Sequence, residues 1–326
     1  MQELNFIEKY IKLISKEMDK ELIIHDPKEL YEPISYILKI GGKRLRPILV
    51  LLSAELFNLN LKTILNKAIA VELFHNFTLI HDDIMDNAPI RRNHVTIHNK
   101  WNLNAAILSG DAVLIKAYSS LISDNLDYSK SVIESFNETA LKVCEGQQLD
   151  MNFESEDKIS LDKYIEMIKL KTAVLIGFCF KVSAIISGTS LSNRNSIYNF
   201  GLFMGICFQL KDDILDLFGD EKFGKKIGGD IISNKKTCLY IMAEKYSNLE
   251  QKKILKNIYS NINITNEEKI NNVKILYKKI KVEENSNKLV QKYYNKALIE
   301  LNKVSVENSR KLKVKLFFDQ IINRKI

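Results

Sequence analysis

The sequence predicts an all-α protein, and three observations carry that prediction. All four prolines (Pro27, Pro33, Pro47 and Pro89) lie near the start of the 326 residues, so the remainder can form uninterrupted helices. Apolar residues recur at helical spacing along most of the chain, and the alternation typical of β-strands is almost absent. We expect a single domain over 1–326, a bundle of about ten or more helices.

The first part of the chain is expected to form four helices, since apolar residues recur three or four positions apart as far as residue 86. Pro47 suits the first turn of the third helix, because a proline there loses no helical hydrogen bond. Pro89 and Arg91-Arg92 mark the polar stretch that follows. The expected helices are 3–24, 30–39, 47–57 and 62–86, with a loop at 87–98.

The same periodicity continues to the end of the chain. Residues 241–326 are richer in Lys and Asn but remain amphipathic, so they are kept in the same domain, and their role is left open. The further expected helices are 103–123, 129–147, 161–188, 193–218, 233–247, 250–260, 266–280, 284–300 and 304–321.

Composition argues against several functional classes. The net charge of +8 invites a nucleic-acid interpretation, but the basic residues are spread along the chain among acidic ones such as Glu283-Glu284. The four cysteines form no CxxC pair, a pattern typical of core thiols in a reducing compartment. We find no signal peptide and no apolar run near the roughly 18 residues that span a bilayer. The sequence therefore predicts a cytoplasmic protein with no membrane span and no nucleic-acid partner.

Two acidic clusters share one pattern. Asp82, Asp83 and Asp86 occupy positions i, i+1 and i+4, and Asp212, Asp213 and Asp216 repeat the pattern 130 residues later. On a helix, residues i and i+4 share a face, where like charges are unfavourable without a cation. One such cluster alone fits an acidic turn or helix cap equally well. Two clusters indicate Mg²⁺ bound together with a diphosphate.

Basic residues flank both clusters. Gly41-Gly42-Lys43-Arg44-Leu45-Arg46-Pro47 places flexible backbone beside cations at an expected helix start, a favourable place for phosphate. Arg91-Arg92 follows the first cluster, and Gln209 and Lys211 precede the second. Lys171-Thr172 and Phe223-Gly224-Lys225 add further phosphate donors. Carboxylates that hold a metal, together with such donors, would stabilise a diphosphate leaving group.

Together these residues resemble the trans-isoprenyl diphosphate synthase (polyprenyl synthetase) family, short-chain type. The resemblance runs in the family's order from residue 41 to about 237. One departure is Asn93, where many relatives have Gly, which leaves the local loop geometry in question. The matching segments are GGKRLRP at 41–47, HNFTLIHDDIMD at 75–86, RR at 91–92, GDA at 110–112, GQQLD at 146–150, KT at 171–172, FQLKDDILD at 208–216, FGKKIGGD at 223–230 and NKKT at 234–237.

The resemblance implies a helical fold around a central active-site cavity, of the isoprenoid synthase type I kind, and a homodimer. It implies a Mg²⁺-dependent condensation of isopentenyl diphosphate with an allylic diphosphate, with Lys171 and Lys225 also catalytic. The implied metal ligands are Asp82, Asp83, Asp86, Asp212, Asp213 and Asp216. The implied allylic diphosphate ligands are Arg91, Lys171, Thr172, Gln209, Lys225 and Lys235. The implied isopentenyl diphosphate ligands are Gly42, Lys43, Arg46, His75 and Arg92.

Product length is expected to depend on Phe77 and Thr78. Phe77 precedes Asp82 by five residues, roughly 7.5 Å along one helix, where the family places the residue that closes the prenyl tunnel. An aromatic residue with a small neighbour resembles synthases of C20 products, while C15 and C25 stay open. Phe77 could also be plain core packing.

Alternative functions and metal sites are weighed against this hypothesis. A class I terpene cyclase needs no isopentenyl diphosphate site, so GGKRLRP and the second cluster argue against it. A non-catalytic partner subunit would carry degenerate aspartates, whereas all six are present. His94 and His98 have ligand-like spacing but lie in an expected loop, and Glu72-x-x-His75 matches only half of a di-iron signature.

Overall fold

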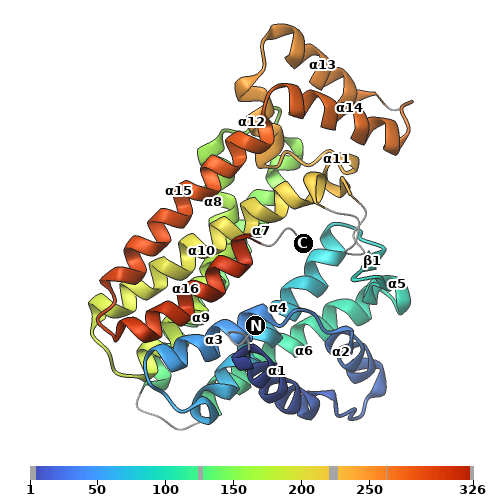
Figure 1. The fold of residues 1–326 in the computed structure, drawn as a ribbon. Helices are drawn as coiled ribbons and strands as arrows, with labels where there is room; N and C mark the ends of the chain where they lie inside the picture. The colour runs from blue at the N-terminus through green and yellow to red at the C-terminus, as the bar shows by residue number, and fades with distance from the viewer. Residues whose placement is uncertain (1–4, 124–127, 220–226, 262, 324–326) are drawn as a thin grey trace. The chain divides into compact units, whose positions relative to one another are not determined.

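The computed structural model describes residues 5–123, 128–219, 227–261 and 263–323, and nearly all of its elements are helical (Figure 1). The expected all-α class is thereby confirmed. The chain divides into two compact units. The first comprises 1–138, 178–198 and 305–314, and the second comprises 139–177, 199–304 and 315–326. The expectations of a single domain and of a central cavity stay predictions.

The first unit is built on the N-terminal helices. Helix α4 is the longest of them, and its N-terminus is capped by Asn60, whose side chain accepts a hydrogen bond from Lys62 N at 2.9 Å. The helices that lie wholly in this unit are α1 (Asn5–Met18), a 3₁₀ turn (Asp19–Leu22), α2 (Lys28–Ile40), α3 (Leu45–Leu56), α4 (Leu61–Met85), α5 (Ile97–Lys100) and α6 (Leu103–Ile122).

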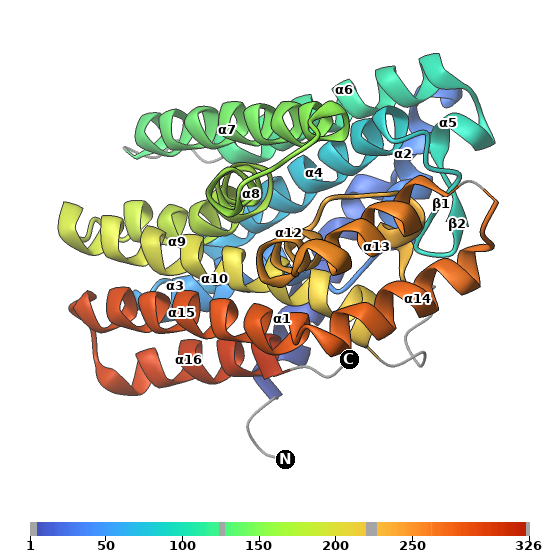
Figure 2. The ribbon, with the colours of Figure 1, turned by 90° about the horizontal axis from the view of Figure 1, so that it is seen from above.

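Helices α4 and α6 lie side by side and form the centre of the first unit (Figure 2). Gly110 lies where the two helices meet: a Cβ atom there would lie 2.3 Å from His81 Nε2, so the imidazole would have to move aside. The inner face of α6 is buried at Ala106, Val113 and Ala117. The outer face of α6 is not covered within this unit.

The second unit contains the C-terminal helices. Helices α13 and α14 form a pair (Figure 1), and capping boxes at Asn248–Gln251 and Thr265–Glu268 fix where each begins. The helices that lie wholly in this unit are α8 (Leu161–Ile168), a π-helix (Lys169–Ala173), α11 (Gly229–Ile232), α12 (Cys238–Tyr246), α13 (Leu249–Ser260), α14 (Asn266–Lys279) and α15 (Val282–Lys303). The unit boundaries fall within α7 (Ser129–Ser155), α9 (Val174–Ile186), α10 (Leu191–Phe218) and α16 (Asn308–Asn323).

Five expected elements differ from the structure, among them the expected helix 129–147, which continues to Ser155 in α7. The first helix ends at Met18 and continues only as a 3₁₀ turn. The expected loop 87–98 contains an antiparallel hairpin of β1 (Ile90–Arg91) and β2 (His94–Val95), followed by α5. The expected helix 161–188 is interrupted by the π-helix, and the expected helix 233–247 begins only at Cys238, as α12.

Helix α6 also corrects the expectation about apolar runs. Among the described residues it is the one helix long and apolar enough to cross a membrane, with a mean hydropathy of 1.4 over an 18-residue window. One helix of this kind is weak support for a span, because packed helices of soluble proteins pass the same test.

Candidate active site

The first acidic cluster ends helix α4. Asp82 and Asp83 lie in its last turn, and Asp86 is its C-terminal cap. A helix C-terminus carries partial negative charge, so three carboxylates there repel both the helix dipole and one another. The side chain of Asp83 is nearly buried, and burial is the main reason that its pKa is raised to about 6. The cluster therefore requires cations close by.

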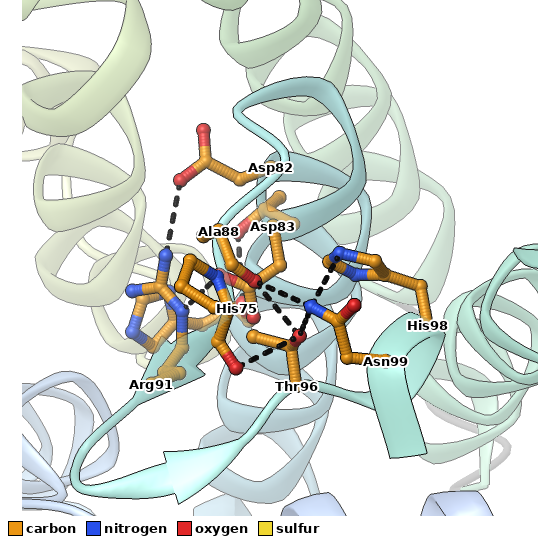
Figure 3. A network of polar contacts seen from close by, with 10 residues as sticks. His75, Asp82, Asp83, Ala88, Arg91, Thr96, His98 and Asn99 are labelled. Atoms are coloured by element: carbon orange, nitrogen blue, oxygen red, sulfur yellow. Dashed lines mark hydrogen bonds and ion pairs between the residues drawn. The ribbon is translucent and has the colours of Figure 1, made fainter. Parts of the chain in front are cut away.

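Arg91 supplies the first of these cations. Its Nε donates to Asp83 Oδ1 at 2.6 Å, and its Nη2 donates to Asp82 Oδ2 at 3.4 Å (Figure 3). Thr96 Oγ1 donates to Ala88 O at 2.8 Å and fixes the segment that carries Arg91. The guanidinium thus holds two of the three aspartates in one orientation.

The hairpin turn resolves the question that Asn93 raised. Arg92 and Asn93 form the turn with φ of 51° and 61°, the left-handed region that tight hairpins require. Asn adopts this conformation more readily than other non-glycine residues, because its short polar side chain bonds locally. Asn93 therefore fits the position where many relatives have Gly.

A group of arginines, which we call the cationic cluster, lies in the same unit and consists of Arg44, Arg46, Arg91 and Arg92. All four lower the pKa of His75, as does burial, which is the largest cause. Arg46 Nη1 lies 2.9 Å from His75 Nε2. Because a guanidinium only donates, His75 accepts through Nε2 and its single proton sits on Nδ1.

Gly42 allows Arg92 to join this cluster. A Cβ on Gly42 would lie 2.7 Å from Arg92 Cζ, and the φ of Gly42 is 155°, so no other residue fits without displacing the guanidinium. The neighbouring Lys43 is exposed. So many cations at one place repel one another, an arrangement that favours a multiply charged anion.

The second acidic cluster lies on α10. Asp213 is buried and is held by three donors: Tyr164 Oη, Gln209 Nε2 at 3.1 Å, and Cys238 N at 3.3 Å. Burial and the charge of Asp230 raise the pKa of Asp213 to about 8. Asp213 therefore ties α10 to α8 and α12.

Its two companions are more open. Asp212 and Asp216 are partly exposed, and Asp216 Oδ2 accepts a hydrogen bond from Asp230 N at 3.2 Å. Each cluster thus has one buried, hydrogen-bonded aspartate and two that are more accessible.

Lys171 and Thr172 lie in the π-helix. Lys171 Nζ donates to Asp150 Oδ2 at 2.6 Å, and Thr172 Oγ1 donates to Gln209 Oε1 at 3.2 Å. Gln209 in turn donates to Asp213, so a chain of hydrogen bonds joins the π-helix to the second cluster.

Four further residues were predicted from the sequence: Lys235, Lys225, Phe77 and Thr78. Lys235 is partly exposed, and its backbone N–H donates to Asp230 O at 2.8 Å. Lys225 lies outside the described residues. The ring of Phe77 is partly exposed, 4.8 Å from the ring of His81, and Thr78 Oγ1 donates to the carbonyl of His75 at 2.8 Å.

Several residues of these networks were not singled out from the sequence. Asp150 belongs to the GQQLD segment, so a sequence motif already pointed to this partner of Lys171. No motif pointed to Tyr164, because its contact with Asp213 spans 49 positions. Glu72 had been considered only as half of a di-iron site, although it forms an ion pair with Arg44 at 2.6 Å.

The donor chemistry suits a hard cation. Within the described part of the chain, no three His, Cys, Asp or Glu side chains converge as a ready-made cation site. The accessible aspartates offer only carboxylate oxygens. Mg²⁺ commonly takes one or two carboxylates and completes its shell with water and substrate phosphates. The aspartates therefore fit Mg²⁺ bound together with a diphosphate.

Known proteins provide an independent comparison. The sequence model of the polyprenyl synthetase family matches residues 27–280. The chain is 40% identical over 229 residues to the geranylgeranyl diphosphate synthase of Methanosarcina mazei, which covers 69% of this chain and 71% of that protein. It is 36% identical over 291 residues to the geranylgeranyl diphosphate synthase of Sulfolobus acidocaldarius, which covers 88% of each.

A crystal structure of a geranylgeranyl pyrophosphate synthase superposes with a TM-score of 0.93 at 41% identity, covering 98% of this chain and 99% of that one. Both the sequence and the fold agree with these relatives, and the chain therefore belongs to the polyprenyl synthetase family.

Proposed function

We propose that this prenyltransferase joins isopentenyl diphosphate head-to-tail to an allylic diphosphate and releases a C20 prenyl diphosphate. The observation that carries the proposal is the cationic cluster beside the carboxylates that end α4. An enzyme that only ionises one prenyl diphosphate needs no such second anion site. The names of the relatives support the C20 product.

Mg²⁺ is the proposed cofactor, and when bound it would neutralise the diphosphate that leaves the allylic carbon. Asp82 and Asp86 would hold it in the first unit, and Asp212 and Asp216 in the second. The hydrogen bonds that Asp83 and Asp213 make to the protein keep each cluster in place.

The protein's own donors bind and orient the substrates. In the first unit, Lys43, Arg46, Arg92 and the neutral His75 would bind the isopentenyl diphosphate, with Gly42 allowing close approach. In the second unit, Lys171, Thr172, Gln209 and Lys235 would bind the allylic diphosphate. Preorganised cations of this kind favour the departure of a diphosphate.

We also propose a cytoplasmic homodimer that acts on these two small substrates and on no nucleic acid. The support for the dimer is a stripe on the outer face of α6, where Leu108, Ile115 and Ile122 recur every seven residues and are 53–66% exposed. A heptad spacing of this kind is typical of helices that pair.

The test is an elongation assay with purified protein, Mg²⁺, isopentenyl diphosphate and radiolabelled farnesyl diphosphate, with products sized by chromatography. We expect a C20 product, and Asp82→Ala should lower kcat by orders of magnitude with an unchanged circular dichroism spectrum. Absence of elongation with every C5–C15 primer would contradict the proposal. Cyclic hydrocarbon products would instead indicate a terpene cyclase.

A further inference from the structure

Glu72 is a buried carboxylate at the centre of α4, and nothing above gives it a function. Its side chain is 3% exposed, and its Oε1 accepts a hydrogen bond from Arg44 Nη1 at 2.6 Å. It precedes His75 by three residues, on the same side of the helix. A buried carboxylate requires a partner that compensates its charge, and Arg44 is that partner.

Arg44 joins three helices. It is the residue immediately before α3, its Nη2 donates to Leu38 O in α2 at 2.9 Å, and its Nη1 reaches Glu72 in α4. Its φ of 48° lies in the left-handed region, which is sterically unfavourable for a side chain such as Arg. The two side-chain hydrogen bonds maintain this conformation. Arg44 is thus engaged as a tether between helices.

The tether controls the residues on either side of Arg44. Gly42 and Lys43 precede it, and Arg46 follows it within the first turn of α3, where it contacts His75. Arg92 packs on the backbone of Gly42. The position of Arg44 therefore determines where the backbone at Gly42 and the guanidinium of Arg46 lie.

Glu72 also provides negative charge within the cationic cluster. Its charge acts on Arg92 as well as on Arg44, while the arginines act unfavourably on one another. Before a diphosphate binds, an internal carboxylate reduces this repulsion. It keeps the cations in place at the cost of some attraction for the incoming anion.

We propose that Glu72 and Arg44 are positioning residues that preorganise the 42–46 segment and Arg92 for the diphosphate of isopentenyl diphosphate. The inference rests on the proposed function, since it names residues that support one of its two substrate sites. Neither residue has to touch the substrate. Both act through Gly42, Arg46 and Arg92.

The test compares Glu72→Gln, which keeps the shape but removes the charge, with Arg44→Lys, which keeps the charge but cannot make both bonds. Each should raise KM for isopentenyl diphosphate about 10- to 100-fold, because small displacements of binding groups are costly. KM for farnesyl diphosphate should change less than about threefold, and kcat should fall less than kcat/KM. The control is Glu284→Gln, which removes an exposed ion pair with Lys288.

Two further measurements separate positioning from other roles. In the double variant, KM should rise no further than in the worse single variant, because the two residues act through one contact. Calorimetric titration with isopentenyl diphosphate and Mg²⁺, without allylic substrate, should show the same loss of affinity. Glu72→Asp, which retains the charge, should keep most of the wild-type affinity for isopentenyl diphosphate.

Three outcomes would overturn the inference: an unchanged KM for isopentenyl diphosphate in Arg44→Lys, equal increases in both KM values, or additive effects in the double variant. If Glu72→Gln does not fold, Arg44→Lys and Glu72→Asp decide the question. If the wild-type enzyme elongates no primer, the proposed function fails. A wild type that elongates normally beside unaffected variants would refute only the positioning role.

Discussion

At the scale of single residues, burial separates the aspartates of each cluster into two kinds, because Asp83 and Asp213 are each 3% exposed. Asp83 pairs with Arg91, and Asp213 is held by Tyr164, Gln209 and the Cys238 amide. Asp86 is exposed, and Asp82, Asp212 and Asp216 are partly exposed. The sequence showed six equivalent carboxylates. Their different surroundings depend on residues from other elements.

Phe77 is the residue on which product length should depend. We expect Phe77→Ala to lengthen the product beyond C20, because the ring that contacts Phe74 and His81 would be removed. Phe57 is another partly exposed aromatic residue in the same unit, and the control variant Phe57→Ala should leave the product unchanged. Chromatographic sizing of the products is the measurement, and an unaltered product from Phe77→Ala would show that this ring does not limit chain growth.

His75 should make the stability of the protein depend on pH. Burial and the arginines lower its pKa in the folded state, so on acidification the unfolded chain takes up this proton first. Its contribution to stability is present above about pH 6.5 and is lost as the pH falls below that value.

Between pH 7.5 and 5.5, we therefore expect the free energy of unfolding of wild type to fall by about 1 kcal/mol relative to that of His75→Gln. Urea unfolding at both pH values measures the difference. His25 is exposed, and the control variant His25→Gln should show the same pH dependence of stability as wild type. If the free energies of unfolding of wild type and His75→Gln differ by the same amount at both pH values, His75 titrates normally in the folded protein.

At the scale of elements, the π-helix at Lys169–Ala173 positions two of the predicted site residues. It carries Lys171 and Thr172 and is contacted by two glycines. A Cβ on Gly146 would lie 2.1 Å from Lys171 N, and one on Gly205 would lie 2.6 Å from Ala173 Cα. Backbone thus packs directly against backbone, which fixes the two side chains without any loop.

Gly146→Ala should disturb this contact. We expect a loss of about 1–3 kcal/mol in the free energy of unfolding, since backbone atoms cannot move aside as a flexible side chain can. KM for farnesyl diphosphate should rise more than KM for isopentenyl diphosphate. Cys144→Ala, an exposed change on the same helix, is the control. Thermal unfolding together with both KM values tests this, and wild-type values would show that the contact is not needed.

The elements also show what sequence patterns can predict. Long apolar periodicity located α4, α6 and α10 to within a few residues, because burial of one helix face is a local property of the sequence. The π-helix and the Tyr164–Asp213 contact escaped prediction because both depend on tertiary neighbours. The hairpin at Ile90–Val95 was missed because two residues per strand give no alternation to detect.

At the scale of the whole molecule, α6 presents two different faces. Its inner face packs on α4, and its outer face carries the stripe of Leu108, Ile115 and Ile122. Exposed apolar residues in such a row are unfavourable in water unless another surface covers them. A second copy of the chain is the partner that we propose.

Ile115→Glu should therefore convert a dimer into a monomer, because two copies of the new charge would be buried in the interface. Light scattering after size-exclusion chromatography measures the mass. Leu249→Glu replaces an apolar residue that is also exposed, in the other unit, and should remain dimeric. A dimeric Ile115→Glu would place the interface elsewhere, and a wild type that requires detergent would favour membrane association.

The π-helix has one more consequence, which concerns rotational phase. A π-turn holds one residue more than an α-helical turn, and each residue of an α-helix advances about 100° around the axis. Deleting Leu170 would allow 161–186 to run as one regular α-helix. Tyr164 and the α9 side chains would then be out of phase by that angle. We expect such a deletion to keep its helical circular dichroism signal and lose elongation, so a regular helix would be incompatible with the activity.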